Sequence, residues 1–161
     1  MTLDKQKIGD WGEKVSETLL QQHGYNEVVN LNKVKHNFPV FDLLAQKDGN
    51  YYLFTIKARN KYNPSNGKLN RQYNILVTKK SRYKLKRALD LVEEIFKIKN
   101  PKLYWITSPI DYSTSLQSFY YGELTHLENW KKLEKEDTYI GVKMNDEVLK
   151  SYSILGESTF Y

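Results

Sequence analysis

Two apolar segments separated by a short turn constrain the fold of this chain more than any other feature of its sequence. They are residues 39–45 and 51–58, and the stretch between them contains an Asp-Gly pair, which is typical of a tight β-hairpin turn. Each segment carries one charged residue, Asp42 in the first and Lys57 in the second. A charge inside an apolar strand is costly unless it is paired or bound to a metal. Because a hairpin would bring both residues to the same end, we expect a site there, or the remains of one.

The residues before the hairpin have the pattern of an amphipathic helix over residues 5–23. Asp4 is a suitable N-cap, and Gly24 suits the left-handed position that follows a helix. The apolar stripe recurs at steps of three and four residues and consists of Ile8, Trp11, Val15 and Leu19. One edge of the helix carries three acids, namely Asp10, Glu13 and Glu17. A solvated acidic edge explains the two outer acids, whereas Glu13 is also open to a functional interpretation.

The segments after this helix alternate between strand and helix patterns. We expect extended segments at residues 26–33, 38–46, 51–59, 74–77, 102–107, 116–124 and 138–144, a loop at 60–72, and helices at 79–97 and 125–135. Thr78 is a suitable N-cap for the helix at 79–97. The hairpin strands are apolar on both faces and so belong inside a covered sheet. The strand–helix–strand order around residues 79–97 favours a parallel pair with a right-handed crossover. The prediction is an α/β fold, with a mixed central sheet, the first helix on one face and the basic helix on the other.

Length and composition favour a single domain over residues 1–161. A chain of 161 residues, 40% of them hydrophobic, is long enough for one core. No window approaches the ~20 apolar residues that a membrane span needs, and no secretory signal is visible, so we expect no membrane association. The three histidines have no zinc-like spacing, and the absence of cysteine excludes disulfides and favours a cytoplasmic setting.

Much of the positive charge of the chain lies in one window. The net charge is +6, and residues 57–87 hold eleven of the 25 basic residues and no Asp or Glu. The rest of the chain has fourteen basic and nineteen acidic residues, a net charge of −5. We therefore expect one strongly positive face. A solvated basic helix is the simpler explanation, but Tyr62, Tyr73 and Tyr83 interleave with these charges and favour contact with nucleic acid.

The helix expected at residues 79–97 carries basic residues at its less favourable end. Lys79, Lys80 and Arg82 lie in its first turn, where the helix dipole is positive. Basic residues at that end cost roughly 0.3–1 kcal/mol each, and a phosphate bound there would reverse the penalty. We therefore expect these three residues, together with Arg59, to bind nucleic acid.

The charged residues of the hairpin and the first helix resemble the PD-(D/E)XK nuclease superfamily, which has the restriction-endonuclease-like fold. The signature of that family is an acid at the start of one strand, then acid-x-Lys on the next, usually with a glutamate on the first helix. Asp42 matches the first acid, Lys57 the lysine and Glu13 the helical glutamate. The resemblance covers residues 5–108 and implies an αβββαβ core, with residues 109–161 as a C-terminal extension.

This resemblance implies a metal-dependent endonuclease that hydrolyses DNA phosphodiester bonds with Mg²⁺ or Mn²⁺. The ligands would be Asp42, Glu13 and the backbone carbonyl of Ile56, with Lys57 as the positive group. The chain departs from the family at Thr55, where a second strand acid is expected. Loss of one charge-assisted interaction costs roughly 1.5–3 kcal/mol, or about ten- to a hundredfold in affinity. Mg²⁺ nevertheless often uses only one or two protein carboxylates.

Two other functions stay open on the sequence alone. The departure at Thr55 is compatible with a catalytically weak or inactive relative that binds nucleic acid, such as an accessory subunit. The basic window is compatible with a protein–protein interaction module of the immunity type that meets an acidic partner. DNA is the partner that we expect, and a homodimer is a further expectation.

Overall fold

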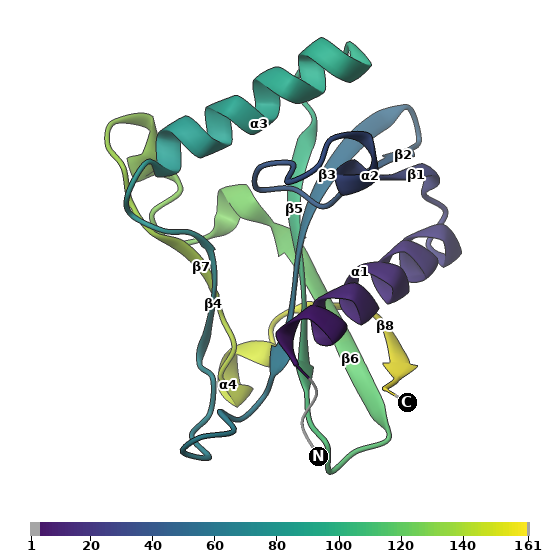
Figure 1. Ribbon diagram of the computed structural model, residues 1–161, viewed down its shortest axis with the longest axis vertical. Coiled ribbons are helices and arrows are strands. Elements are labelled where there is room, and N and C mark those ends of the chain that lie inside the picture. Colours follow the sequence, from purple (N-terminus) through teal and green to yellow (C-terminus); the bar gives the residue numbers. More distant parts are fainter. Residues whose placement is uncertain (1–3, 161) are drawn as a thin grey trace.

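The computed structural model describes residues 4–160, which form two sheets with helices around them (Figure 1). The elements in chain order are α1 (Lys5–Gln22), β1 (Asn26–Asn30), α2 (Leu31–Val34), β2 (Leu43–Lys47), β3 (Asn50–Asn60), β4 (Gln72–Leu76), α3 (Ser81–Phe96), β5 (Lys102–Ile110), β6 (Leu116–Glu123), η1 (Leu124–His126), η2 (Lys131–Glu134), β7 (Ile140–Lys143), α4 (Asp146–Leu149) and β8 (Ser153–Thr159). The central sheet has the strand order β1-β2-β3-β5-β6-β8. Because β3 and β5 are parallel and the other neighbours antiparallel, this sheet is mixed, as predicted.

The helices α1 and α3 cover opposite faces of the central sheet, which confirms the predicted layers (Figure 1). Leu20 of α1 packs in one cluster with Phe54 of β3, and Leu91 of α3 packs in another with Leu53. Neighbouring residues of a strand point to opposite faces, so β3 is apolar on both sides because both sides are covered. No helix within residues 4–160 is long and apolar enough to cross a membrane.

The strands β2 and β3 form the hairpin that the sequence predicted. Leu43 lies opposite Phe54 in the antiparallel register. The turn consists of Asp48 and Gly49, whose φ angles are 52° and 80°. Positive φ at both positions is the geometry of a type I′ turn, which matches the twist of the two strands. The open end of this hairpin is where the site was expected.

Several strand boundaries differ from the prediction, and two of these differences have a clear local cause. The first strand ends at Asn30 rather than residue 33, because the Asn30 side chain accepts a hydrogen bond from the Asn32 N–H at 3.0 Å and so caps α2. The strand expected from residue 38 begins at Leu43. Pro39 has no N–H to donate to a strand ladder, and Val40 has a φ of 64°, which no regular strand contains.

The basic helix also starts later than expected. It begins at Ser81 rather than Lys79, and Lys80 takes the N-cap position with a left-handed φ of 61° and no side-chain cap. The cap predicted at Thr78 is therefore wrong. Residues 125–135 form the two short 3₁₀ turns η1 and η2 instead of one helix. Asn129 has a φ of 71°, which interrupts the helical backbone between them.

Strand pairing differs from the prediction at β4. The parallel partner of β5 is β3 and not residues 74–77, which belong to β4 and pair with β7 in a separate antiparallel sheet. β4 fully buries only Tyr73 and Leu76, whereas β3 buries a continuous run of residues. A strand that is apolar on both faces takes the central position, and a half-buried strand fits an outer ribbon. The edge strand β8 was not predicted.

Candidate functional site

Asp42 is held in place by hydrogen bonds immediately before β2. Its N–H donates to the Phe54 carbonyl at 2.8 Å, and its carbonyl accepts from the Leu31 N–H at 2.9 Å. Its carboxylate Oδ2 accepts from the Ile56 N–H at 2.7 Å. Burial raises the pKa of Asp42, against the lowering effects of the Ile56 N–H and of the Lys57 charge. The backbone therefore fixes a largely buried carboxylate at the open end of the hairpin.

Lys57 lies on β3 at the same end of the hairpin, without a close ionic partner. Desolvation lowers the pKa of Lys57, and the nearby charges of Asp42 and Glu13 act in the opposite direction. Among residues 4–160, the ion pairs within 4.0 Å do not include Lys57. Its ammonium group is thus near two carboxylates but is not held by either one. This arrangement differs from a structural salt bridge.

Glu13 reaches the same site from α1. The helix lies close to β3 because Gly12 has no side chain, and a Cβ there would come within 2.7 Å of the Cβ of Ala58. Burial and the negative charges of Asp42 and Asp10 together raise the pKa of Glu13 to about 7, against smaller lowering effects of Asn32 and Lys57. Two carboxyl groups therefore share one partly buried site and destabilise each other's ionised form.

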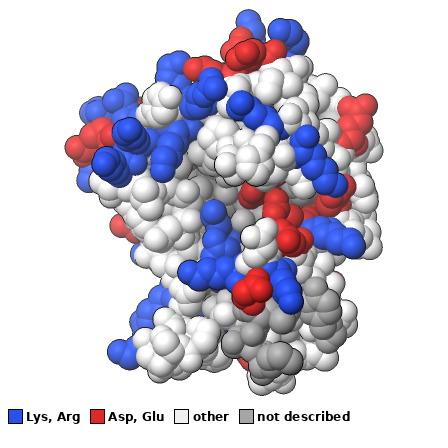
Figure 2. Space-filling model, viewed as in Figure 1, with Lys and Arg blue, Asp and Glu red and all other residues white. Residues whose placement is uncertain are grey.

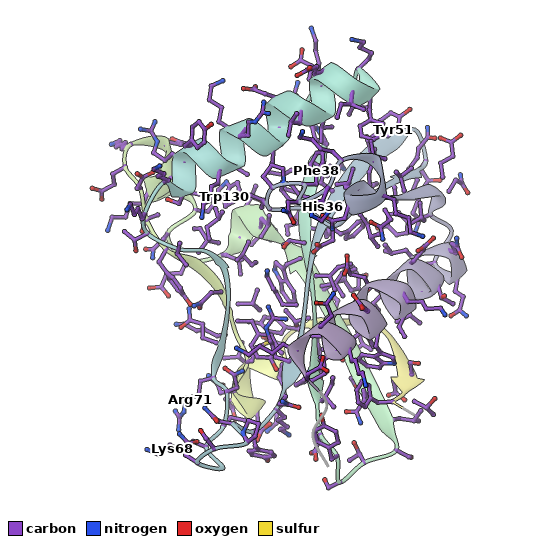
Figure 3. The ribbon with its side chains drawn as sticks, in the orientation of Figure 1. His36, Phe38, Tyr51, Lys68, Arg71 and Trp130 are labelled. Atoms are coloured by element: carbon purple, nitrogen blue, oxygen red, sulfur yellow. The ribbon has the colours of Figure 1, made fainter. Side chains whose placement is uncertain are left out.

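Asn32 is a site residue that the sequence interpretation missed. Its Oδ1 accepts a hydrogen bond from the Phe38 N–H at 3.1 Å, which leaves the amide Nδ2 to donate elsewhere. Hydrogen bonding by this side chain lowers the pKa of both Glu13 and Asp42. Figure 3 labels Phe38 on the loop after α2. The available signal was the presence of three asparagines within the strand expected at residues 26–33, where asparagine is disfavoured.

Thr55 occupies the position on β3 where the family resemblance expects an acid. It lies between Phe54 and Ile56, which both hydrogen-bond Asp42, so it stands opposite Asp42 in the hairpin. The side chain is fully buried, and its Oγ1 has no hydrogen-bond partner among residues 4–160. Thr107 pairs with Lys57 in the register of β3 and β5, and its hydroxyl is likewise buried without a partner in the described part of the chain. Both hydroxyls lie on the same face of the sheet as Lys57.

The site offers about the smallest number of protein ligands with which a hard divalent cation such as Mg²⁺ is usually bound. Within residues 4–160, no group of three or more His, Cys, Asp or Glu side chains is arranged to hold a metal ion. The residues available are the two carboxylates Glu13 and Asp42, with the Ile56 carbonyl as the further expected ligand. Mg²⁺ keeps several waters and commonly takes one or two carboxylates together with substrate phosphates. A cation between two mutually repelling carboxylates would also favour the ionised form of both.

The four basic residues expected to bind nucleic acid fall in two places. Arg59 belongs to the site, because its charge lowers the pKa of both Asp42 and Lys57. We use the name site cluster for these grouped side chains, which are Glu13, Asn32, Asp42, Lys57 and Arg59. The other three expected residues, Lys79, Lys80 and Arg82, lie at the start of α3 and do not join the site cluster.

Arg82 is engaged by the segment that contains η2. Its Nε donates to the Leu133 carbonyl at 2.8 Å, and its Nη2 donates to the Glu134 carbonyl at 3.0 Å. Its backbone N–H donates to Asp137 Oδ1 at 2.9 Å. The negative charge that the sequence pattern suggested at this helix end is thus present as the carboxylate of Asp137. The N-terminus of α3 is complemented from within the chain.

The basic residues of the 57–87 window form separate areas instead of one continuous patch. Figure 2 shows blue atoms over the N-terminal part of α3 and a second blue group near the centre, beside acidic atoms. Lys68 and Arg71 lie at the far end of the loop between β3 and β4, away from α3 (Figure 3). Lys61 is paired with Asp146 at 3.3 Å. The long loop and the helix separate charges that are close in sequence.

Comparison with known proteins identifies the fold. No family model and no curated protein matches the sequence. Among solved structures, the chain is similar to Hjc, a Holliday junction resolvase from the archaeal hyperthermophile Archaeoglobus fulgidus. The TM-score is 0.52 at 12% sequence identity, and the match covers 91% of this chain and 90% of that one. This likeness confirms the restriction-endonuclease-like fold that the sequence resemblance implied.

Proposed function

We propose that this protein is a metal-dependent endonuclease that hydrolyses phosphodiester bonds of DNA. The observation that carries the proposal is the convergence of Glu13, Asp42 and Lys57 at the open end of the β2–β3 hairpin, on a restriction-endonuclease-like fold. The similar solved structure is a Holliday junction resolvase, so DNA is the substrate class that the fold favours.

The site residues divide into ligands and a charge-stabilising group. Asp42 and Glu13, with the Ile56 carbonyl, would hold Mg²⁺ or Mn²⁺, and Asn32 would keep the two carboxylates in a converging orientation. When bound, the ion would stabilise the negative charge that develops on the phosphate. Lys57 has no carboxylate within 4.0 Å in the described residues, so its ammonium group would be available to a phosphate oxygen. Arg59 would add a second cation beside the same strand of the substrate.

A second candidate function is binding of DNA without cleavage. The observation in its favour is Thr55, a buried neutral residue at the position of the second strand acid. One ligand fewer weakens metal binding, by about ten- to a hundredfold on the estimate for one charge-assisted interaction. The site cluster would then recognise phosphate through Lys57 and Arg59 alone.

Cleavage assays separate the two candidates. Supercoiled plasmid, linear duplex and branched DNA are incubated with the protein in Mg²⁺, in Mn²⁺ and in EDTA. We expect metal-dependent cleavage that is abolished by Lys57→Ala, while DNA binding in EDTA persists. Binding without cleavage in either metal would support the second candidate. Absence of both binding and cleavage at low salt would contradict both.

A further inference from the structure

A groove beside the site cluster is lined by groups that donate hydrogen bonds. It lies between the start of α1 and the loop that follows β3, with a volume of about 320 Å³. Its polar lining comes from Lys5, Arg59, Asn60, Asn63 and Asn70. Among the described residues, no Asp or Glu lines it. We call it the donor groove.

The orientation of Asn63 shows why the groove presents donors. Its Oδ1 accepts hydrogen bonds from the Ser65 N–H at 2.9 Å and from the Ser65 hydroxyl at 2.7 Å. A backbone N–H can only donate, so the atom that it meets is the amide oxygen, and the Nδ2 of this groove-lining residue remains available to donate. The Asn60 side chain is oriented in the same way. Its Oδ1 accepts from the Tyr112 hydroxyl at 2.8 Å, and its Nδ2 can act as a donor.

The floor of the groove is apolar, and one wall is shared with the site cluster. Ile8 and Ala58 are each only 2% exposed and form the floor. Arg59 belongs to the groove and to the site cluster, and its Nη1 donates to the Ala58 carbonyl at 2.8 Å. Lys57 and Arg59 are two residues apart on β3, or about 6.6 Å by strand geometry. Because Arg59 itself lines the groove, a ligand that binds Lys57 and also contacts the Arg59 guanidinium would reach the groove.

We propose that the donor groove binds the sugar–phosphate unit next to the phosphate held at the site cluster, on the same DNA strand. Amide donors and two cations suit phosphate oxygens, which only accept hydrogen bonds, and the apolar floor suits the face of a deoxyribose. A volume near the lower end of ligand pockets, roughly 300–1,000 Å³, fits one such unit. This inference rests on the proposed function and adds a second phosphate subsite to it.

The first test compares Asn63→Asp with Asn66→Asp. Both residues lie in the same loop, both amide oxygens accept backbone N–H groups, and a carboxylate can keep those bonds. The two substitutions change the net charge equally, but Asn66 does not line the groove. Affinity for fluorescent duplex and branched DNA is measured in EDTA, where no metal-dependent cleavage occurs. We expect Asn63→Asp to weaken binding by about ten- to a hundredfold and Asn66→Asp by about twofold or less, with a salt slope reduced by about 0.9 in Asn63→Asp alone.

The second test locates the phosphate on the DNA. A single neutral methylphosphonate linkage is moved along one strand, and affinity is measured for the parent and for Asn63→Asp. At one position on the strand, the neutral linkage should weaken DNA binding by the parent protein. The same linkage should not weaken binding by Asn63→Asp any further, because the linkage and the substitution remove the same contact. Two results would contradict binding of a phosphate in the donor groove: equal DNA affinities of Asn63→Asp and Asn66→Asp, or losses of affinity from substitution and linkage that add up at every position. Neither result would affect DNA cleavage by the parent protein. No DNA binding by the parent would overturn the groove and the proposed function together.

A second pair of variants covers the case in which Asn63→Asp does not fold. Lys5 and Lys7 both lie in the first turn of α1, but only Lys5 lines the groove. Lys5→Gln should weaken DNA binding more than Lys7→Gln. The two variants should bind equally well to DNA that carries the methylphosphonate linkage at the position identified in the second test. Equal losses for the two lysine variants would contradict the proposal independently of the asparagine pair.

Discussion

The site cluster and the first turn of α3 both concentrate charge, but the structure satisfies them differently. At α3, Arg82 donates to two backbone carbonyls, and Asp137 accepts from the helix N-terminus. At the site cluster, Lys57 has no ion pair within 4.0 Å among residues 4–160, and Glu13 has its pKa raised to about 7. Arg82 thus has close partners from its own chain, whereas Lys57 has no such partner among residues 4–160.

This difference indicates which region has been left open for a ligand. A charged group whose partners come from its own chain contributes to folding, and a ligand there must compete with them. A group that is desolvated without a close partner destabilises the protein until a ligand supplies the missing charge. The four predictions below test this contrast, starting with the largest expected effect.

Replacing Asp42 by Asn should remove DNA cleavage, by at least about a hundredfold, because a charged ligand is lost. Asn keeps an oxygen that can accept from the Ile56 N–H, so the hairpin should persist. We expect the melting temperature in metal-free buffer to stay the same or rise, since one buried charge disappears. Asp90→Asn, at an exposed pair on α3, is the control for activity. A loss of roughly 3–5 kcal/mol would instead indicate a structural pair with Lys57.

Replacing Thr55 by Asp should tighten metal binding by about ten- to a hundredfold, because it restores a carboxylate opposite Asp42. Isothermal titration with Mn²⁺ and Mg²⁺ measures the change. Thr107→Asp is the matched control, since Thr107 is equally buried with a partnerless hydroxyl but lies on β5, beside Lys57. A folded Thr55→Asp protein that binds metal no better than the parent would show that residue 55 does not face the metal ligands.

Replacing Asp137 by Asn should lower the free energy of unfolding by about 0.3–1 kcal/mol, the range for one negative charge near a helix N-terminus, because Asn can still accept from the Arg82 N–H. The negative charge at the start of α3 is removed, while the site cluster is untouched. Chemical denaturation measures the stability, and plasmid cleavage measures the activity, which should not change. A large fall in DNA cleavage with little change in stability would show that the start of α3 contributes to activity, and not only to folding.

Glu13 should make the free energy of unfolding depend on pH. Its pKa of about 7 in the folded protein lies above its ordinary value of 4.5, so the folded state binds the proton more tightly. This contribution is complete below about pH 4.5 and is lost as pH rises to about 7. Denaturant unfolding at pH 5 and pH 8 should therefore differ less in Glu13→Gln than in the parent. An unchanged difference in the variant would show that Glu13 is not the group that titrates.

Much of the fold could be predicted because its signals are local. The Asp-Gly turn sets the hairpin register within a few residues, and Asp4 caps α1 through a hydrogen bond to the Lys7 N–H at 2.9 Å. The continuous apolar runs of β2 and β3 indicate that both faces of these strands are buried. Asp42 and Lys57 could be placed at one end of the hairpin for the same reason, because the turn fixes which residues of the two strands lie opposite each other.

The tertiary structure decided the features that depend on residues far apart in the chain. The bond from Arg82 to Asp137 joins positions 55 apart, and no local pattern indicates that a distant acid satisfies this helix end. Asn32 could be recognised beside the two carboxylates only after α1, α2 and the hairpin had packed together. β4 was assigned to the wrong sheet because its partner β7 follows more than 60 residues later. The sequence by itself determined the elements, through short-range backbone geometry and side-chain periodicity. Packing alone determined which charges are neutralised and which are left for a ligand, because electrostatic energy depends on distance and burial in space.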